Sequence, residues 1–163
     1  MGTRSRIAIQ NGASFRSIYC HWDGYVGYNG KLLAEHYLQA DKVNALLNLG
    51  DISSLAEHVR PLGGVKQGFA DGRIKTACVA YADRGENDCP PQVAKSLDEL
   101  LKQADESGTE YVYIFHDGVW LVTWHGEFRA FGMGPDDDGE GSPWLPLQTL
   151  DGALLDEQKA GAA

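Results

Sequence analysis

Residues 18–30 read I-Y-C-H-W-D-G-Y-V-G-Y-N-G, and the fold we expect is organised around this stretch. It lies where the alternating pattern of residues 16–20, typical of a strand, changes to the three- and four-residue apolar spacing of residues 31–49, typical of a helix. Its aromatic and charged residues therefore fall on a loop between two rigid elements, where binding residues are commonly found. This loop is the first candidate for a functional site.

The residues before this loop predict an antiparallel hairpin. Residues 4–10 alternate between polar and apolar, Asn11-Gly12 is a strong two-residue turn signal, and the alternation resumes over residues 14–20. After the loop, residues 31–49 predict one amphipathic helix, or two that meet near residues 39–41, ended by Gly50. Residues 49–55 then predict a helix C-cap followed by a short turn of helix.

The second half of the chain predicts one more helix and several strands. Ser96 and Glu99 form a capping box at the start of a helix. The turn residues Asp117-Gly118 join two strands of a meander. The expected strands cover residues 75–81, 111–115, 119–124 and 127–131.

This order of elements predicts an α+β fold, with a mainly antiparallel sheet of five or six strands and helices packed on one face. We expect residues 1–132 to form a single α+β domain. Residues 133–163 are expected to form an acidic loop, followed by a C-terminal extension that packs back on the domain.

Charge and composition exclude several classes of protein. Of the 163 residues, the first 75 carry nine Lys and Arg against six Asp and Glu, whereas the remainder carry five against seventeen. A chain this acidic is not expected to bind nucleic acid directly. It has neither a run of about 18 apolar residues nor a signal peptide, so we expect no membrane association and a cytoplasmic location. Three cysteines without close spacing do not form a disulfide framework.

Catalytic chemistry has weak support. His21 and Asp23, joined by His36 from the following helix, would suit a divalent metal or a general base, but no known metal or catalytic spacing is present. We therefore predict no catalytic residue, no metal ligand and no cofactor. The more common role of such a set is structural.

Binding has more support. Trp22, Tyr25 and Tyr28 would stack on a base or form a protein-binding surface, and Arg4 lies near enough in sequence to meet a phosphate. Arg84 and Glu86 follow a predicted buried strand, where ligands are often held. The predicted binding residues are His21, Trp22, Asp23, Tyr25, Tyr28, His36, Arg4, Arg84 and Glu86.

The chain carries several distinctive short strings, which are M-G-T-R-S at residues 1–5, I-Y-C-H-W-D-G-Y at residues 18–25, His36-Tyr37, L-G-D-I-S-S-L at residues 49–55 and D-R-G-E at residues 83–86. In these strings it resembles a group of small, functionally uncharacterised proteins encoded by bacteriophages and prophages. The resemblance covers roughly residues 1–125, and the chain departs from the group where Val26-Gly27-Tyr28 replaces an expected Pro-Glu-Gly. The group has no established activity, and the resemblance implies a phage setting, in which small acidic proteins often disarm a host system.

The expected function is therefore that of a phage-encoded, non-enzymatic accessory protein that binds and inhibits a host protein, such as a component of bacterial immunity. Under this counter-defence hypothesis, the acidic second half of the chain would imitate the negative charge of nucleic acid. One alternative is an oligomeric protein that sequesters a nucleotide messenger. A second alternative is a metal-dependent hydrolase that uses the loop at His21.

Overall fold

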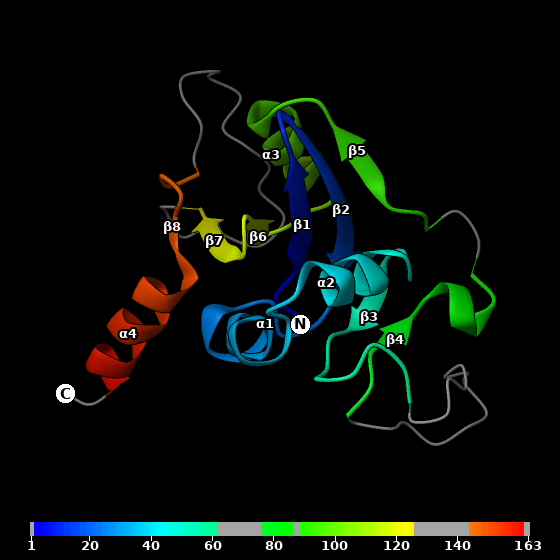
Figure 1. The fold of residues 1–163 in the computed structure, drawn as a ribbon, viewed down its shortest axis with the longest axis horizontal. Helices are drawn as coiled ribbons and strands as arrows, with labels where there is room; N and C mark the ends of the chain where they lie inside the picture. The colour runs from blue at the N-terminus through cyan, green and yellow to red at the C-terminus, as the bar shows by residue number, and fades with distance from the viewer. Residues whose placement is uncertain (1, 62–75, 87–88, 126–143, 162–163) are drawn as a thin grey trace.

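The structure is a computed structural model that describes residues 2–61, 76–86, 89–125 and 144–161 (Figure 1). Within these residues it has one mixed sheet and four α-helices. The strands are β1 (Ser5–Asn11), β2 (Ser14–Cys20), β3 (Ile52–Ser54), β4 (Val79–Ala80), β5 (Gln92–Ala94), β6 (Tyr111–His116), β7 (Val119–Trp124) and β8 (Gln148–Thr149). The helices are α1 (Lys31–His36), α2 (Ala40–Leu47), α3 (Leu97–Glu106) and α4 (Leu150–Gly161), with a π-helical turn η1 (Val26–Gly30) and a 3-10 turn η2 (Ala82–Arg84).

The sheet confirms the α+β class and differs in detail from the expected one. Its strand order is β4-β3-β2-β1-β6-β7-β8, with β5 paired to β2, so the described residues contain eight strands instead of five or six. The sheet is mixed, because β1 pairs with β6 and β2 pairs with β3 in parallel. Both parallel pairs join segments far apart in the sequence. Turn residues reveal hairpins between neighbouring strands and carry no signal for such pairs.

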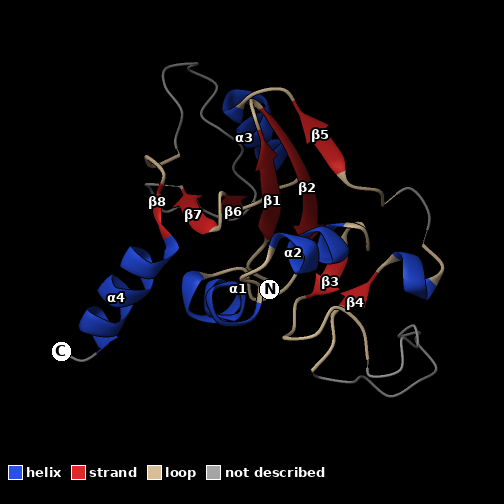
Figure 2. Ribbon diagram, viewed as in Figure 1, coloured by secondary structure: helices blue, strands red, loops and turns tan. Residues whose placement is uncertain are grey.

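Helices cover both faces of the sheet, so the expectation of helices on one face was wrong (Figure 2). Leu33 of α1, Leu46 of α2 and Leu150 of α4 belong to one buried cluster, together with alternate residues of β1 and β2. On the opposite face, Leu100 and Ala104 of α3 pack against the other set of alternate residues. Both faces of β1 and β2 are therefore apolar over part of their length. Helix α3 packs on a second hydrophobic core, on the face opposite α1, α2 and α4.

The locally encoded elements are confirmed. The first hairpin forms, although its turn residues are Gly12 and Ala13 and not Asn11 and Gly12, because the register places Ile7 opposite Ile18. The predicted helical stretch is two helices, which meet at residues 37–39. Ser96 caps α3 by accepting a hydrogen bond of 3.1 Å from the backbone N–H of Glu99. Asp117 and Gly118 form the tight turn between β6 and β7, both with positive φ.

One local prediction was wrong. Residues 52–54 form β3 and not a turn of helix, since Ile52 pairs with Cys20 and with Ala80. Pairing with two strands on opposite sides supplies the hydrogen bonds that a lone helical turn would have to make internally.

The C-terminal segment joins the sheet and the core. β8 pairs with β7, and Leu150 and Ala153 of α4 are buried in the same cluster as β1 and β2. The predicted strand at residues 127–131 and the acidic loop with Asp136, Asp137, Asp138 and Glu140 lie outside the described residues. No helix in the described part of the chain has the length and apolar character that crossing a membrane requires.

Candidate functional site

The main chain of residues 21–24 is fixed by hydrogen bonds to three other parts of the chain. The backbone N–H groups of His21 and Trp22 donate to the carbonyl oxygens of Ile52 and Ser53. The N–H of Gly24 donates to the carbonyl of Thr3 at 2.7 Å. On the other side, the Tyr113 hydroxyl donates to the carbonyl of Gly24 at 2.6 Å. The loop therefore extends the sheet instead of lying free above it.

The far end of the loop is closed by Asn29, which is fully buried. Its Nδ2 donates to the carbonyl of Trp22 at 3.1 Å, and its backbone N–H donates to the carbonyl of Asp23 at 3.1 Å. Asp23 has a φ of 56°, a left-handed conformation that aspartate tolerates better than most residues. Residues 22–29, which we call the aromatic loop, are thus a rigid corner of the fold.

Three large side chains of the aromatic loop point outward despite this rigid backbone. Trp22, Tyr25 and Tyr28 are exposed by 42%, 40% and 44%. The rings of Tyr25 and Tyr28 lie 6.2 Å apart, inclined by 53°. Within this loop the main chain and Asn29 therefore have a structural role. The three aromatic side chains are left free to make contacts from the surface.

His21 lies beside the loop and contacts its own neighbours on the sheet. Its Nδ1 is 2.8 Å from the hydroxyl of Tyr19. Its ring is perpendicular to the ring of Trp22, with 4.7 Å between the two ring centroids. Burial and the nearby Arg4 guanidinium lower the pKa of His21, so its imidazole is mostly neutral at pH 7. Burial raises the pKa of Tyr19 to about 12, so this hydroxyl stays protonated. His21 therefore lies near the guanidinium of Arg4, with the Tyr19 hydroxyl and the Trp22 ring in contact with it.

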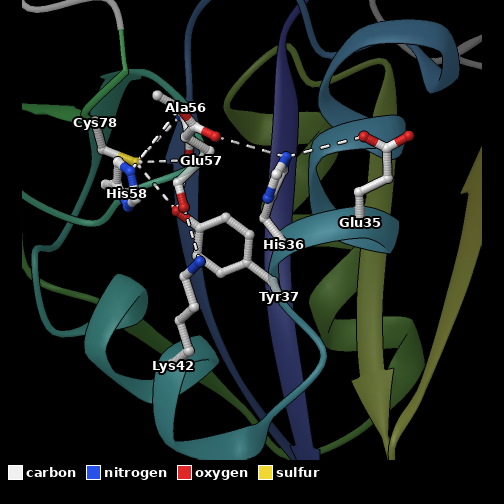
Figure 3. A network of polar contacts seen from close by, with 8 residues as sticks. All are labelled: Glu35, His36, Tyr37, Lys42, Ala56, Glu57, His58 and Cys78. Atoms are coloured by element: carbon white, nitrogen blue, oxygen red, sulfur yellow. Dashed lines mark hydrogen bonds and ion pairs between the residues drawn. The ribbon is translucent and has the colours of Figure 1, made fainter.

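His36 lies elsewhere and contacts two glutamates. Its Nε2 is 3.9 Å from a carboxylate oxygen of Glu35 and 3.9 Å from one of Glu57 (Figure 3). Within the described residues, no group of three His, Cys, Asp or Glu side chains is placed to hold a metal. The set of His21, Asp23 and His36 considered from the sequence is therefore not assembled.

The network next to His36 stabilises the core (Figure 3). The buried Tyr37 hydroxyl donates to the carbonyl of Ala56 at 2.7 Å and lies 3.5 Å from the sulfur of Cys78. Lys42 lies over the Tyr37 ring and donates to the carbonyl of Glu57 at 2.7 Å. Burial raises the pKa values of the Tyr37 hydroxyl and the Cys78 thiol, so neither group is prepared to ionise.

Arg84 and Glu86 belong to a different part of the surface. They flank Gly85, which has a φ of 86° and ends η2. Next to them, Asp83 forms an ion pair with Arg60, with 2.7 Å between Nη1 and Oδ2. Glu86 lines a shallow hollow together with Asn48, Leu49, Gly50, Ala82, Cys89, Pro90 and Pro91.

Arg6 is not among the predicted binding residues. It is only 2% exposed, and its Nη2 donates to Oε1 of the exposed Gln92 at 2.7 Å. Its Nε and Nη1 are buried without a hydrogen-bond partner among the described residues. Burial lowers the pKa of Arg6, while the carboxylate of Asp51 acts in the opposite direction. The alternation of β1 places Arg6 on an inner face, but an arginine in that pattern usually reaches solvent.

Replacing Arg6 with methionine is expected to leave the free energy of unfolding unchanged or to raise it by about 1–2 kcal/mol, because a buried charge without full partners opposes folding. Urea denaturation at pH 7 measures this change through the transition midpoint. Arg6→Gln is the comparison and is expected to be less stable than Arg6→Met, since it buries a shorter polar group. A loss of more than about 2 kcal/mol in Arg6→Met would show that the guanidinium stabilises the fold.

Glu157 was not predicted from the sequence as a site residue. This exposed residue of α4 reaches the aromatic loop, and its carboxylate lies against Gly27. No local pattern connects two residues so far apart in the chain.

Comparison of the chain with protein families, with curated proteins and with solved structures gave no match.

Proposed function

We propose that this protein acts by binding another protein through Trp22, Tyr25 and Tyr28. In the phage setting implied by the sequence resemblance, the bound protein is a host component that the complex inhibits, such as a part of bacterial immunity. The observation that carries the proposal is that these three aromatic side chains are each at least 40% exposed on a corner whose main chain is fixed. Tyrosine and tryptophan are enriched at protein interfaces and among the residues that dominate binding energy.

Rigidity of the aromatic loop favours binding. A flexible loop loses conformational entropy when it is ordered by a partner, whereas the hydrogen bonds of Gly24 and Asn29 order this loop in the free protein. The hydrogen bonds that hold the corner come from the N–H of Gly24 and from the side chains of Asn29 and Tyr113, and not from the exposed rings. Retaining three large apolar side chains at such a place is typical of a contact surface.

Affinity capture from a bacterial lysate, with the full chain as bait, identifies the partner. For the captured protein, Trp22→Ala and Tyr28→Ala are each expected to weaken binding by about 30-fold, the effect of losing a residue that dominates an interface. Calorimetry with the purified partner measures the change in Kd.

Val119→Ala is the matched control, because Val119 is also an exposed apolar residue, 48% accessible, but lies at the start of β7. It is expected to leave the Kd unchanged. Equal binding by the wild type and both aromatic variants would refute the proposal. Stabilisation of the protein by a nucleotide, with no protein captured, would instead favour the messenger-sequestering alternative.

A further inference from the structure

A carboxylate lies on the backbone segment that carries the two exposed tyrosines. Gly27 stands between Tyr25 and Tyr28, and a Cβ added to it would lie 2.7 Å from Oε1 and 3.2 Å from Cδ of Glu157. The missing side chain of Gly27 is what allows the Glu157 carboxylate to approach so closely. Helix α4 and the turn η1 pack together, so this approach comes from the main contact between the two elements.

The rings of Tyr25 and Tyr28 and the carboxylate of Glu157 all attract positive charge. The face of an aromatic ring is electronegative, and the carboxylate against Gly27, between the two tyrosines in the chain, adds negative charge to this surface. Glu157 is also close enough to Tyr111 and Tyr113 to raise the pKa of each, although burial is the larger cause for both. Asp156, next along α4, is exposed as well. This surface therefore attracts a cation.

Among the described residues, no Lys or Arg side chain lies over the ring of Tyr25 or Tyr28. Lys31 and Lys159 are exposed residues of the neighbouring helices α1 and α4. In the part of the chain that the structure describes, the cation that lies over an aromatic ring is Lys42, on Tyr37. Tyr25, Tyr28 and Glu157 are thus open to a cation from another molecule.

We propose that Tyr25, Tyr28 and Glu157 bind an arginine or lysine side chain of the partner, so that the partner presents a basic segment to this surface. The inference rests on the proposed protein-binding function and gives its partner a chemical character. A planar guanidinium stacks on tyrosine rings and donates hydrogen bonds to a carboxylate at the same time. The net charge of −9 on the whole chain favours the approach of such a segment.

Calorimetry with an octa-arginine peptide, at about 150 mM salt to screen long-range attraction, tests the site directly. Glu157→Gln and Tyr28→Leu are each expected to weaken peptide binding by about fivefold. Tyr28→Phe is expected to bind within about twofold of the wild type, because the ring is kept. Gly27→Ala is expected to behave like Glu157→Gln, since the added methyl group displaces the carboxylate that lies against Gly27.

Glu106→Gln is the charge-matched control, because Glu106 is an exposed glutamate at the end of α3. Equal losses in Glu106→Gln and Glu157→Gln would mean that only net charge matters and would overturn the inference. Unchanged binding in Tyr28→Leu would overturn it too.

The two proposals fail in different ways. If the partner captured from lysate loses affinity in Trp22→Ala but not in Glu157→Gln, protein binding stands and the cation site is wrong. If octa-arginine shows the expected pattern while the captured partner is indifferent to Trp22→Ala and Tyr28→Ala, the cation site stands and the proposed interface is wrong.

Discussion

Replacing Gly24 with alanine is expected to lower the free energy of unfolding by about 3 kcal/mol, the upper end of the usual cost of overpacking. A Cβ at this position would lie 2.7 Å from the Cβ of Ser5, 2.8 Å from the carbonyl oxygen of Thr3 and 2.9 Å from the carbonyl carbon of Arg4. These atoms belong to the chain entering β1, which cannot rotate aside as the end of a long side chain would. The same shift would weaken the hydrogen bonds from Gly24 to Thr3 and from Tyr113 to Gly24.

Chemical denaturation at pH 7 measures the loss, and Gly27→Ala is the control from the same loop. The three atoms nearest to the methyl group of Gly27→Ala all belong to the flexible end of Glu157, so a change in the free energy of unfolding below about 1 kcal/mol is expected. Similar stabilities for the two variants would contradict the view that the main chain of the aromatic loop is held by close backbone packing. Because the exposed rings depend on this corner, Gly24→Ala is also expected to impair partner binding.

Replacing Gly50 with alanine is expected to cost about 4 kcal/mol, which combines two penalties. Gly50 has a φ of +75°, a left-handed conformation that costs an alanine about 1 kcal/mol. In addition, a Cβ would clash with the carbonyl oxygen of Cys89, which adds about 3 kcal/mol of overpacking. The same carbonyl accepts a hydrogen bond of 2.8 Å from the N–H of Asp51, so moving it breaks a contact that positions the start of β3.

Gly12→Ala separates these two penalties. Gly12 has a φ of +61° in the turn between β1 and β2, and its added Cβ would meet no atom within 4 Å. Only the backbone penalty of about 1 kcal/mol applies there. Thermal and urea unfolding are therefore expected to give a much lower free energy of unfolding for Gly50→Ala than for Gly12→Ala. Equal losses of unfolding free energy in Gly50→Ala and Gly12→Ala would mean that the backbone of Cys89 moves away from the added methyl group at no energetic cost.

The candidate site could be predicted in part. Trp22, Tyr25 and Tyr28 were predicted as binding residues because aromatic residues gather on a loop between a strand and a helix, but no pattern shows which rings face solvent. Exposure depends on Asn29 and Tyr113, which hold the backbone from inside. His36 was grouped with His21 because they lie close in the sequence, whereas α1 carries His36 to Glu57.

By itself, the sequence determined the elements whose causes lie within a few residues. The turn at Gly12, the cap at Ser96 and the turn at Asp117 each depend on backbone conformations or hydrogen bonds that neighbouring residues provide. The tertiary structure alone decided the parallel pairing of β1 with β6, the second helical face, the burial of Arg6 and the contact of Glu157 with Gly27. These features join distant segments, and their energies depend on register and packing across the whole sheet, which no local pattern encodes.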